Sequence, residues 1–237
     1  MRELTVLADR AAVEQSVAEL LVKEIIDVLA IRDECTIVLT GGTVGIGTLH
    51  AVARSPRCAD VSWDRVRILW GDERYVPAGH TDRNDEQADE ALLRHVPVDS
   101  RKVLRFPSSD SGLSLETAAG EFTKMLVLEF PDGFHADVTL CGIGPDGHVA
   151  SLFPGLDHGT GTVVAVHHSP KPPAERLSLT FEALNSSRKI WIVCAGTDKA
   201  EAVHRLMTDD AETTPAVHLK GLEETKVFAD TSAASAL

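Results

Sequence analysis

The stretch TIVLTGGTVGIGTLHAVAR, residues 36–54, decides the fold. Its apolar beginning, residues 36–39, has the length and composition of a buried strand. A glycine turn at 40–42 ends this strand, and a helix is predicted from about residue 45 to residue 54. A strand that leads directly into a helix is one unit of the alternating pattern that builds parallel sheets.

The same pattern recurs on both sides of this unit. Further strands are predicted at residues 4–8, 66–70, 137–141, 162–166, 177–180, 189–194 and 227–229, and further helices at 10–30, 84–95, 114–129 and 198–207. Because strands alternate with helices, we predict an α/β fold of three layers, with a mainly parallel sheet covered by helices on both faces. The loops are too short to be interdomain linkers, so residues 1–237 are predicted to form a single domain.

Four of the predicted strands end in polar or glycine-rich turns. These turns are TGG at 40–42, GDER at 71–74, GIGPDGH at 142–148 and AGTDK at 195–199. In open α/β sheets, ligands bind at the carboxyl ends of the strands. The four turns are therefore expected to meet at one edge of the sheet and to carry the chemistry of the protein.

The composition disfavours several classes of partner. With 43% apolar residues the chain can bury a sizeable core, and its formal net charge of −13 argues against binding to nucleic acid or to an anionic membrane. No apolar run is long enough to span a bilayer, and the first residues lack a secretory signal.

The four cysteines show no metal-binding spacing, and reduced thiols fit the cytoplasmic location that we expect.

The glycines Gly142, Gly144 and Gly147 match the G-x-G-x-x-G fingerprint of dinucleotide-binding proteins. However, Asp146 lies inside the motif, where it would repel a pyrophosphate, and the acidic residue expected about 20 positions further on is absent. A catalytic turn is the better interpretation, with His148 as a general base near neutral pH and Asp146 as its partner. A capping aspartate followed by a surface histidine is the structural alternative.

Backbone N–H groups and a lysine at the same edge predict an anion site. Gly41, Gly42 and Thr43 offer free N–H groups and a hydroxyl at a helix N-terminus. Lys199 falls in a first helical turn, where its charge opposes the helix dipole unless an anion binds there. A plain strand-to-helix turn and a tolerated surface lysine are the structural alternatives.

Charged residues in two further segments are candidates for substrate contacts. Asp72, Glu73 and Arg74 come directly after a buried strand, where charges need partners or a ligand. The Arg74 guanidinium can donate to a carbonyl or phosphate oxygen. Lys171 and Arg176 belong to a segment that prolines stiffen, which suits an anion site. A structural ion-pair cluster and a solvated proline-rich turn remain the alternatives.

Together, these segments resemble the 6-phosphogluconolactonase family. The resemblance rests on TGGTVGIG at 40–47, ILWGDERYVP at 68–77 with Asn84 beyond it, GIGPDGHVASLFPG at 142–155, SPKPPAERLSLT at 169–180 and AGTDKA at 195–200. It covers about residues 36–205, and GIGPDGH..SLFPG followed by SPKPP..R is its most specific part. The chain departs from the family at Thr43-Val44-Gly45, where many relatives carry Ser-Thr-Pro.

The resemblance implies a fold shared with glucosamine-6-phosphate deaminases and ribose-5-phosphate isomerases, and hydrolysis of 6-phosphoglucono-1,5-lactone in the oxidative pentose phosphate pathway. In the resulting hypothesis, His148 activates water, and Asp146 positions either His148 or the ring hydroxyls. Arg74, aided by Lys171, stabilises the oxyanion. The phosphate is expected to bind to the turn 41–43, Lys199 and a cation of the 171–176 loop. We expect a monomer that needs no metal or redox cofactor and binds only this small phosphorylated lactone.

Two other functions stay open. One is an amino-sugar phosphate deaminase or isomerase on the same fold, although the SPKPP loop and the DGH..SLFPG motif favour the lactonase. The other is a non-catalytic protein that binds sugar phosphates. Such a protein would not need His148 and Asp146 together, which favours the enzyme.

Overall fold

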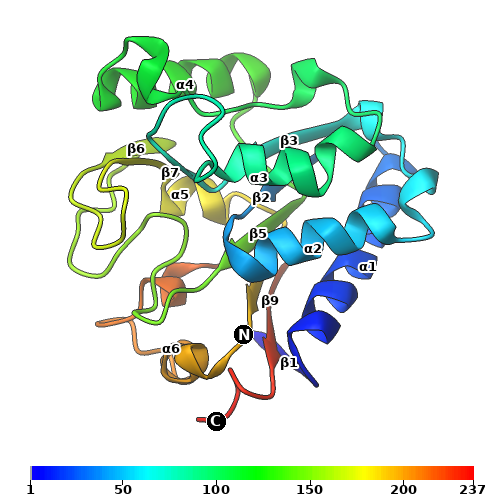
Figure 1. Cartoon of the computed structure of the whole chain (residues 1–237), viewed down its shortest axis with the longest axis vertical. Coiled ribbons are helices and arrows are strands. Elements are labelled where there is room, and N and C mark those ends of the chain that lie inside the picture. The colour runs from blue at the N-terminus through cyan, green and yellow to red at the C-terminus, as the bar shows by residue number, and fades with distance from the viewer. Residues whose placement is uncertain (1) are drawn as a thin grey trace.

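The computed structural model describes residues 2–237 and contains a six-stranded parallel sheet (Figure 1). Its strands lie in the order β1 (Glu3–Leu7), β9 (Glu224–Asp230), β8 (Lys189–Cys194), β5 (Val138–Gly142), β2 (Cys35–Leu39) and β3 (Val66–Trp70). Every neighbouring pair is parallel, which confirms the predicted α/β fold. All residues of β2 are buried, as expected of a central strand that is covered on both faces.

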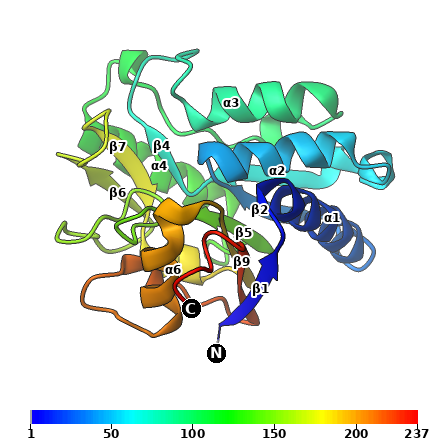
Figure 2. The same ribbon diagram turned by 60° about the horizontal axis from the view of Figure 1, so that its bottom comes forward.

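The helices cover both faces of this sheet. They are α1 (Arg10–Leu29), α2 (Gly42–Arg54), α3 (Asn84–Ala91), α4 (Leu115–Glu129), α5 (Phe181–Asn185) and α6 (Ala200–Met207). The chain adds β2 and β3 in one direction along the sheet and then β5, β8 and β9 in the other. With right-handed crossovers, this reversal places α5 and α6 on the face opposite α1 and α2. Figure 2 shows strands of the sheet between α1 and α2 on one side and α6 on the other.

The helix predictions are confirmed with shifted ends. Helix α1 is capped by the Asp9 side chain, which accepts a hydrogen bond from the Ala12 N–H at 2.8 Å. The helix predicted from residue 45 begins at Gly42, so the glycine turn already belongs to the first turn of α2. The short helix α5 is not predicted by the sequence, since its five residues are too few for a periodic pattern.

A second sheet, which the sequence does not predict, is antiparallel. It contains β4 (Asp72–Arg74), β7 (Arg176–Leu179) and β6 (Val163–Val166) in that order. The strands predicted at 162–166 and 177–180 exist, but they belong to this sheet and not to the parallel one. Gly71 connects the two sheets, because its N–H donates to Leu39 O at 3.0 Å and its carbonyl oxygen accepts from the Leu179 N–H at 2.8 Å.

The cysteines are free, and three of the four are buried. Burial raises the pKa of the Cys141 thiol and of the Cys194 thiol to about 12, so both act as small apolar side chains of the core. Within residues 2–237, no group of three or more His, Cys, Asp or Glu side chains is arranged to hold a metal ion. Over the same residues, no helix is long and apolar enough to cross a membrane.

Candidate active site

The four predicted turns meet at one edge of the parallel sheet, because they follow the neighbouring strands β8, β5, β2 and β3. Residues from these turns line two adjoining cavities of about 220 and 340 Å³. The smaller one contains His148 and is called the histidine cavity; the larger one lies at the N-terminus of α2 and is called the helix cavity. Both are lined by Gly41, Gly42, Gly142, Ile143 and Lys199.

His148, which lines the histidine cavity, forms a hydrogen-bonded pair with Asp146. His148 Nδ1 lies 2.5 Å from Asp146 Oδ1, and the His148 ring packs on Phe153 with a centroid distance of 4.4 Å. Burial would raise the pKa of Asp146, but the hydrogen bond and charge of His148, together with Lys171, lower it to about 2. The ionised carboxylate therefore holds the ring proton on Nδ1 and leaves Nε2 free to accept another proton.

The glycines of the same turn leave space for the His148 and Asp146 side chains, which a Cβ atom would otherwise occupy. A Cβ atom added at Gly144 would fall 2.0 Å from His148 Nδ1 and 2.4 Å from Asp146 Oδ1. Gly147 has a φ of +83°, which favours glycine, and a Cβ there would press on Thr214. The G-x-G-x-x-G spacing is thus explained by a tight turn that brings an aspartate and a histidine together.

Three positive side chains from the second sheet and its loop also line the histidine cavity: Arg74, Lys171 and Arg176. Arg74 donates through Nη1 to Asp82 O at 2.5 Å and lies opposite Arg176 in the β4–β7 pair. Burial lowers the pKa of Lys171, and the nearby charges of Lys199 and Arg176 lower it further, although Asp146 opposes them. Positive side chains that lie close together repel one another, and an anionic ligand would relieve this repulsion. The cavity is therefore suited to an anionic ligand.

Arg176 has a structural task as well. Its guanidinium donates to the carbonyl oxygens of Lys171, Pro172 and Pro173 at 3.0–3.2 Å. Its Nη1 also lies 3.7 Å from Asp72 Oδ2. Arg176 therefore holds the 171–173 loop in the shape that presents Lys171 to the cavity.

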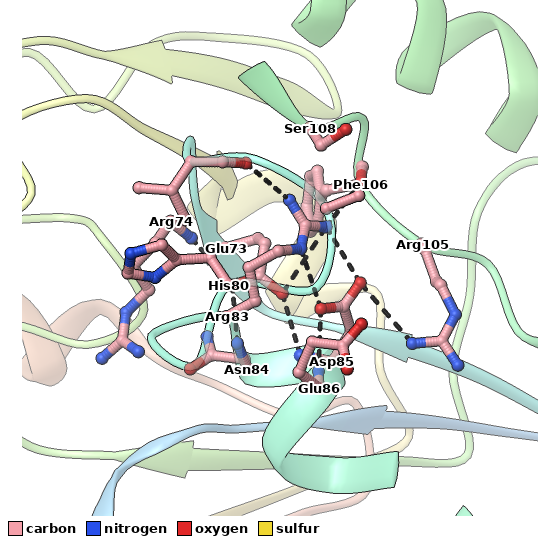
Figure 3. Close-up of polar contacts among 12 residues, drawn as sticks. Glu73, Arg74, His80, Arg83, Asn84, Asp85, Glu86, Arg105, Phe106 and Ser108 are labelled. Carbon is pink, nitrogen blue, oxygen red and sulfur yellow. Dashed lines mark hydrogen bonds and ion pairs between the residues drawn. The ribbon is translucent and has the colours of Figure 1, made fainter. Parts of the chain in front are cut away.

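Asp72 and Glu73 were both predicted to contact the substrate, but they lie on opposite sides of β4. Asp72 lines the histidine cavity and accepts a hydrogen bond from Ser151 Oγ at 2.6 Å. Glu73 lies outside both cavities and is 1% exposed, so the prediction of substrate contact is wrong for this residue. Successive side chains alternate along a strand, which directs Asp72 and Arg74 to the cavity and Glu73 away from it. Figure 3 shows Glu73 among Arg83, Asn84 and Asp85.

The helix cavity has the features of an anion site. Gly41, Gly42 and Thr43 line it at the N-terminus of α2, where backbone N–H groups and the positive end of the helix dipole face the cavity. Lys199 lies between this cavity and the histidine cavity, with its Nζ 3.0 Å from Asp198 Oδ2. The structure therefore brings together the turn and the lysine that are predicted from the sequence to bind one anion.

Two further residues of the site were not among the predicted contacts. Arg10, the first residue of α1, lines the helix cavity. Its charge opposes the helix dipole, which is the signal that singles out Lys199, so it could have been found in the same way. Asn84 lines the histidine cavity, is 1% exposed, and packs against Gly41. The sequence places Asn84 in a family motif but gives no physical signal for its contacts.

Comparisons with known proteins show the family of the chain. Residues 8–228 match the family of glucosamine-6-phosphate isomerases and 6-phosphogluconolactonases. The chain belongs to this family. It is 40% identical to a 6-phosphogluconolactonase of Streptomyces coelicolor, over 99% of this chain and 94% of that protein.

Solved structures of the family share the fold. A 6-phosphogluconolactonase from Thermotoga maritima is 26% identical with a TM-score of 0.84, over 98% of this chain and all of the other. A monomeric glucosamine-6-phosphate deaminase, a member of the NagB superfamily, is 21% identical with a TM-score of 0.83, over 99% of this chain and all of the other. The predicted likeness to the deaminase fold is therefore confirmed.

Proposed function

We propose that the chain hydrolyses 6-phospho-D-glucono-1,5-lactone to 6-phospho-D-gluconate, a step of the oxidative pentose phosphate pathway. The observation that carries this proposal is His148, which is paired with Asp146 and lines one cavity with Arg74 and Lys171, next to the glycine turn at the N-terminus of α2. The Streptomyces coelicolor 6-phosphogluconolactonase, at 40% identity over nearly the whole chain, supports the same substrate.

In the proposed mechanism, His148 is the general base. Its free Nε2 accepts a proton from a water molecule, and the water oxygen attacks C1 of the lactone. The bond between C1 and the ring oxygen then breaks, the proton passes from His148 to the ring oxygen, and C1 becomes a carboxylate after releasing a second proton. A positioned base of this kind contributes about 10²–10⁴-fold to the rate.

Arg74 is assigned to the negative charge that develops on the C1 oxygen, with help from Lys171. One such donor contributes on the order of 10²–10³-fold, because it acts where little water competes. Asp72 and Arg176, on the same cavity wall, are proposed to contact the sugar hydroxyls. Neither metal nor redox cofactor enters any step, because a lactone is already an activated ester.

The phosphate is assigned to the helix cavity. Backbone N–H groups of Gly41, Gly42 and Thr43 would donate to its oxygens, and Lys199 and Arg10 would neutralise its charge. The cations of the 171–176 loop line the histidine cavity instead, so they are assigned to the lactone ring and not to the phosphate. Binding at the phosphate would place C1 beside His148.

Lys199→Ala is expected to raise KM by about tenfold and to change kcat by less than about threefold, because it removes one charged hydrogen bond to a group remote from the reacting atoms. The measurement is steady-state hydrolysis of the phospholactone, with inorganic phosphate as a competing inhibitor. Lys124→Ala, at a side chain that is 72% exposed on α4, is the matched control. An unaltered KM in the Lys199 variant would show that the phosphate binds elsewhere.

The proposed function is tested with purified protein and four compounds. Turnover of the phospholactone well above the spontaneous rate, with much slower turnover of the unphosphorylated lactone, is the expected result. Release of ammonia from glucosamine 6-phosphate would instead indicate the deaminase reaction of the same family. Binding of 6-phosphogluconate without turnover of any of the compounds would indicate a sugar-phosphate-binding protein.

We further propose that residues 1–237 act as one domain, as a monomer and in the cytoplasm. One hydrophobic core connects both sheets, which supports a single folding unit. The free cysteines fit a reducing compartment. The net charge of −13 disfavours nucleic acid as a partner and leaves the small phosphorylated lactone as the proposed ligand.

A further inference from the structure

We propose that Glu73 is a positioning residue whose carboxylate fixes the backbone from which Arg74 reaches the histidine cavity. This inference rests on the proposed function, because Arg74 is assigned there to the oxyanion. Glu73 is 1% exposed and lies outside the cavity, so it acts through its neighbour and not on the substrate. Figure 3 shows the Arg74 side chain directed away from Glu73.

Three backbone N–H groups converge on the Glu73 carboxylate (Figure 3). Oε1 accepts from Arg74 N at 2.8 Å and from Asn84 N at 2.7 Å, while Oε2 accepts from Asp85 N at 2.9 Å. The last two donors belong to the first turn of α3, where N–H groups lack partners within the helix. One side chain therefore ties the strand that carries Arg74 to the end of a helix.

Asn84 extends this connection to the anion site. Its Nδ2 donates to Asp72 O at 2.8 Å. Its Oδ1 packs against Gly41, where an added Cβ atom would fall 1.9 Å away. Glu73 also accepts a hydrogen bond from the Asn84 N–H, so Asn84 is bonded to strand β4 through both its backbone and its side chain and packs against the glycine turn.

The charges around Glu73 are buried and paired. Arg83 forms two hydrogen bonds of 2.9 Å with the Asp85 carboxylate, and its Nη2 lies 3.9 Å from Glu73 Oε2. Arg105 Nη1 lies 3.5 Å from Asp85 Oδ2. Burial and the charge of Asp85 raise the pKa of Glu73, against the effect of Arg83 and of the N–H donors. Buried ion clusters often stabilise a protein no better than apolar packing, so the geometry imposed on β4 explains this one better.

The test is a double-mutant cycle of Glu73→Gln with Arg74→Ala, read as kcat/KM for the phospholactone. Glutamine keeps one accepting oxygen but replaces the other with an amide NH₂ group. This group would face a backbone N–H donor instead of accepting from it, so β4 should shift. With Arg74 present we expect Glu73→Gln to cost about tenfold to a hundredfold, as for a misplaced catalytic group. In the Arg74→Ala variant the same change should cost less than about threefold, because the group that Glu73 positions is gone.

A merely structural role would give the same loss in both backgrounds, and that result would overturn the proposal, as would an unaffected kcat/KM in Glu73→Gln. Asp85→Asn is the control, because it removes a charge from the same cluster but keeps the acceptor of the Arg74 N–H. This variant should have a lower Tm and little change in kcat/KM.

If Glu73→Gln does not fold, Glu73→Asp, whose shorter side chain withdraws the carboxylate from the N–H donors, takes its place in the cycle. Lactone turnover by the unaltered protein is measured first, so a failure of the proposed function is recognised separately.

Discussion

Replacing His148 with alanine is expected to lower kcat for the phospholactone by about 100-fold or more, because the variant has no base to take a proton from water. KM should change little, since the phosphate binds in the neighbouring cavity. The fold should persist, because the ring lies at the cavity wall with 15% of its side chain exposed. The measurement is steady-state kinetics beside a thermal unfolding curve.

His135→Ala serves as the control for this experiment, because His135 is an exposed histidine in the loop before β5. It should leave both kcat and Tm unchanged. If the His148 variant turned over substrate at the normal rate, His148 could not be the base, and the assignment of the histidine cavity to the lactone carbonyl would fall with it.

Gly144→Ala is expected to lower kcat by a similar factor, although it adds only one methyl group. The new Cβ would stand 2.0 Å from His148 Nδ1 and 2.4 Å from Asp146 Oδ1, so the hydrogen-bonded pair has to separate. His148 would then lose the partner that fixes its proton on Nδ1, and Nε2 would no longer be held ready for water. Kinetics should show the loss in kcat, with KM within about threefold of the original value.

Gly120→Ala is the matched control for the glycine prediction. Gly120 lies within α4, and a Cβ atom there meets nothing within 4 Å. Alanine should stabilise that helix by about 0.5–1 kcal/mol and leave activity unchanged. Full activity in Gly144→Ala would mean that the turn relaxes and that the hydrogen bond between His148 and Asp146 is kept. The close packing at Gly144 would then not be needed for catalysis.

The position of the candidate site follows from local sequence signals and one general rule. Apolar runs such as 66–70 predict their own strands, and strands separated by helices are parallel, so their carboxyl ends share an edge. The rule applies whatever the strand order is. That is why Gly41, His148 and Lys199 could be placed together without knowledge of the topology.

The second sheet could not be predicted in this way. Strand β4 has only three residues, too few to show an alternating pattern, and its partner β7 lies about a hundred residues further on. The role of Glu73 was missed for the same reason. If residues 72–74 had been predicted as a strand, the Glu73 side chain would have been expected on the opposite face from those of Asp72 and Arg74. They were predicted as a turn, and side chains in a turn do not alternate in this way.

The pairing of Arg74 with Arg176 across β4 and β7 has a consequence for how this enzyme family can be altered. The separation of the two guanidinium groups depends on backbone hydrogen bonds between the strands, so residues inserted at the exposed positions Asp157 and Thr160 of the loop before β6 should move neither group. One residue inserted into β4 ahead of Arg74 would instead turn that side chain toward the protein interior and bring a different one to the substrate. Attempts to widen the range of accepted sugars should therefore lengthen loops and leave this pair of strands intact.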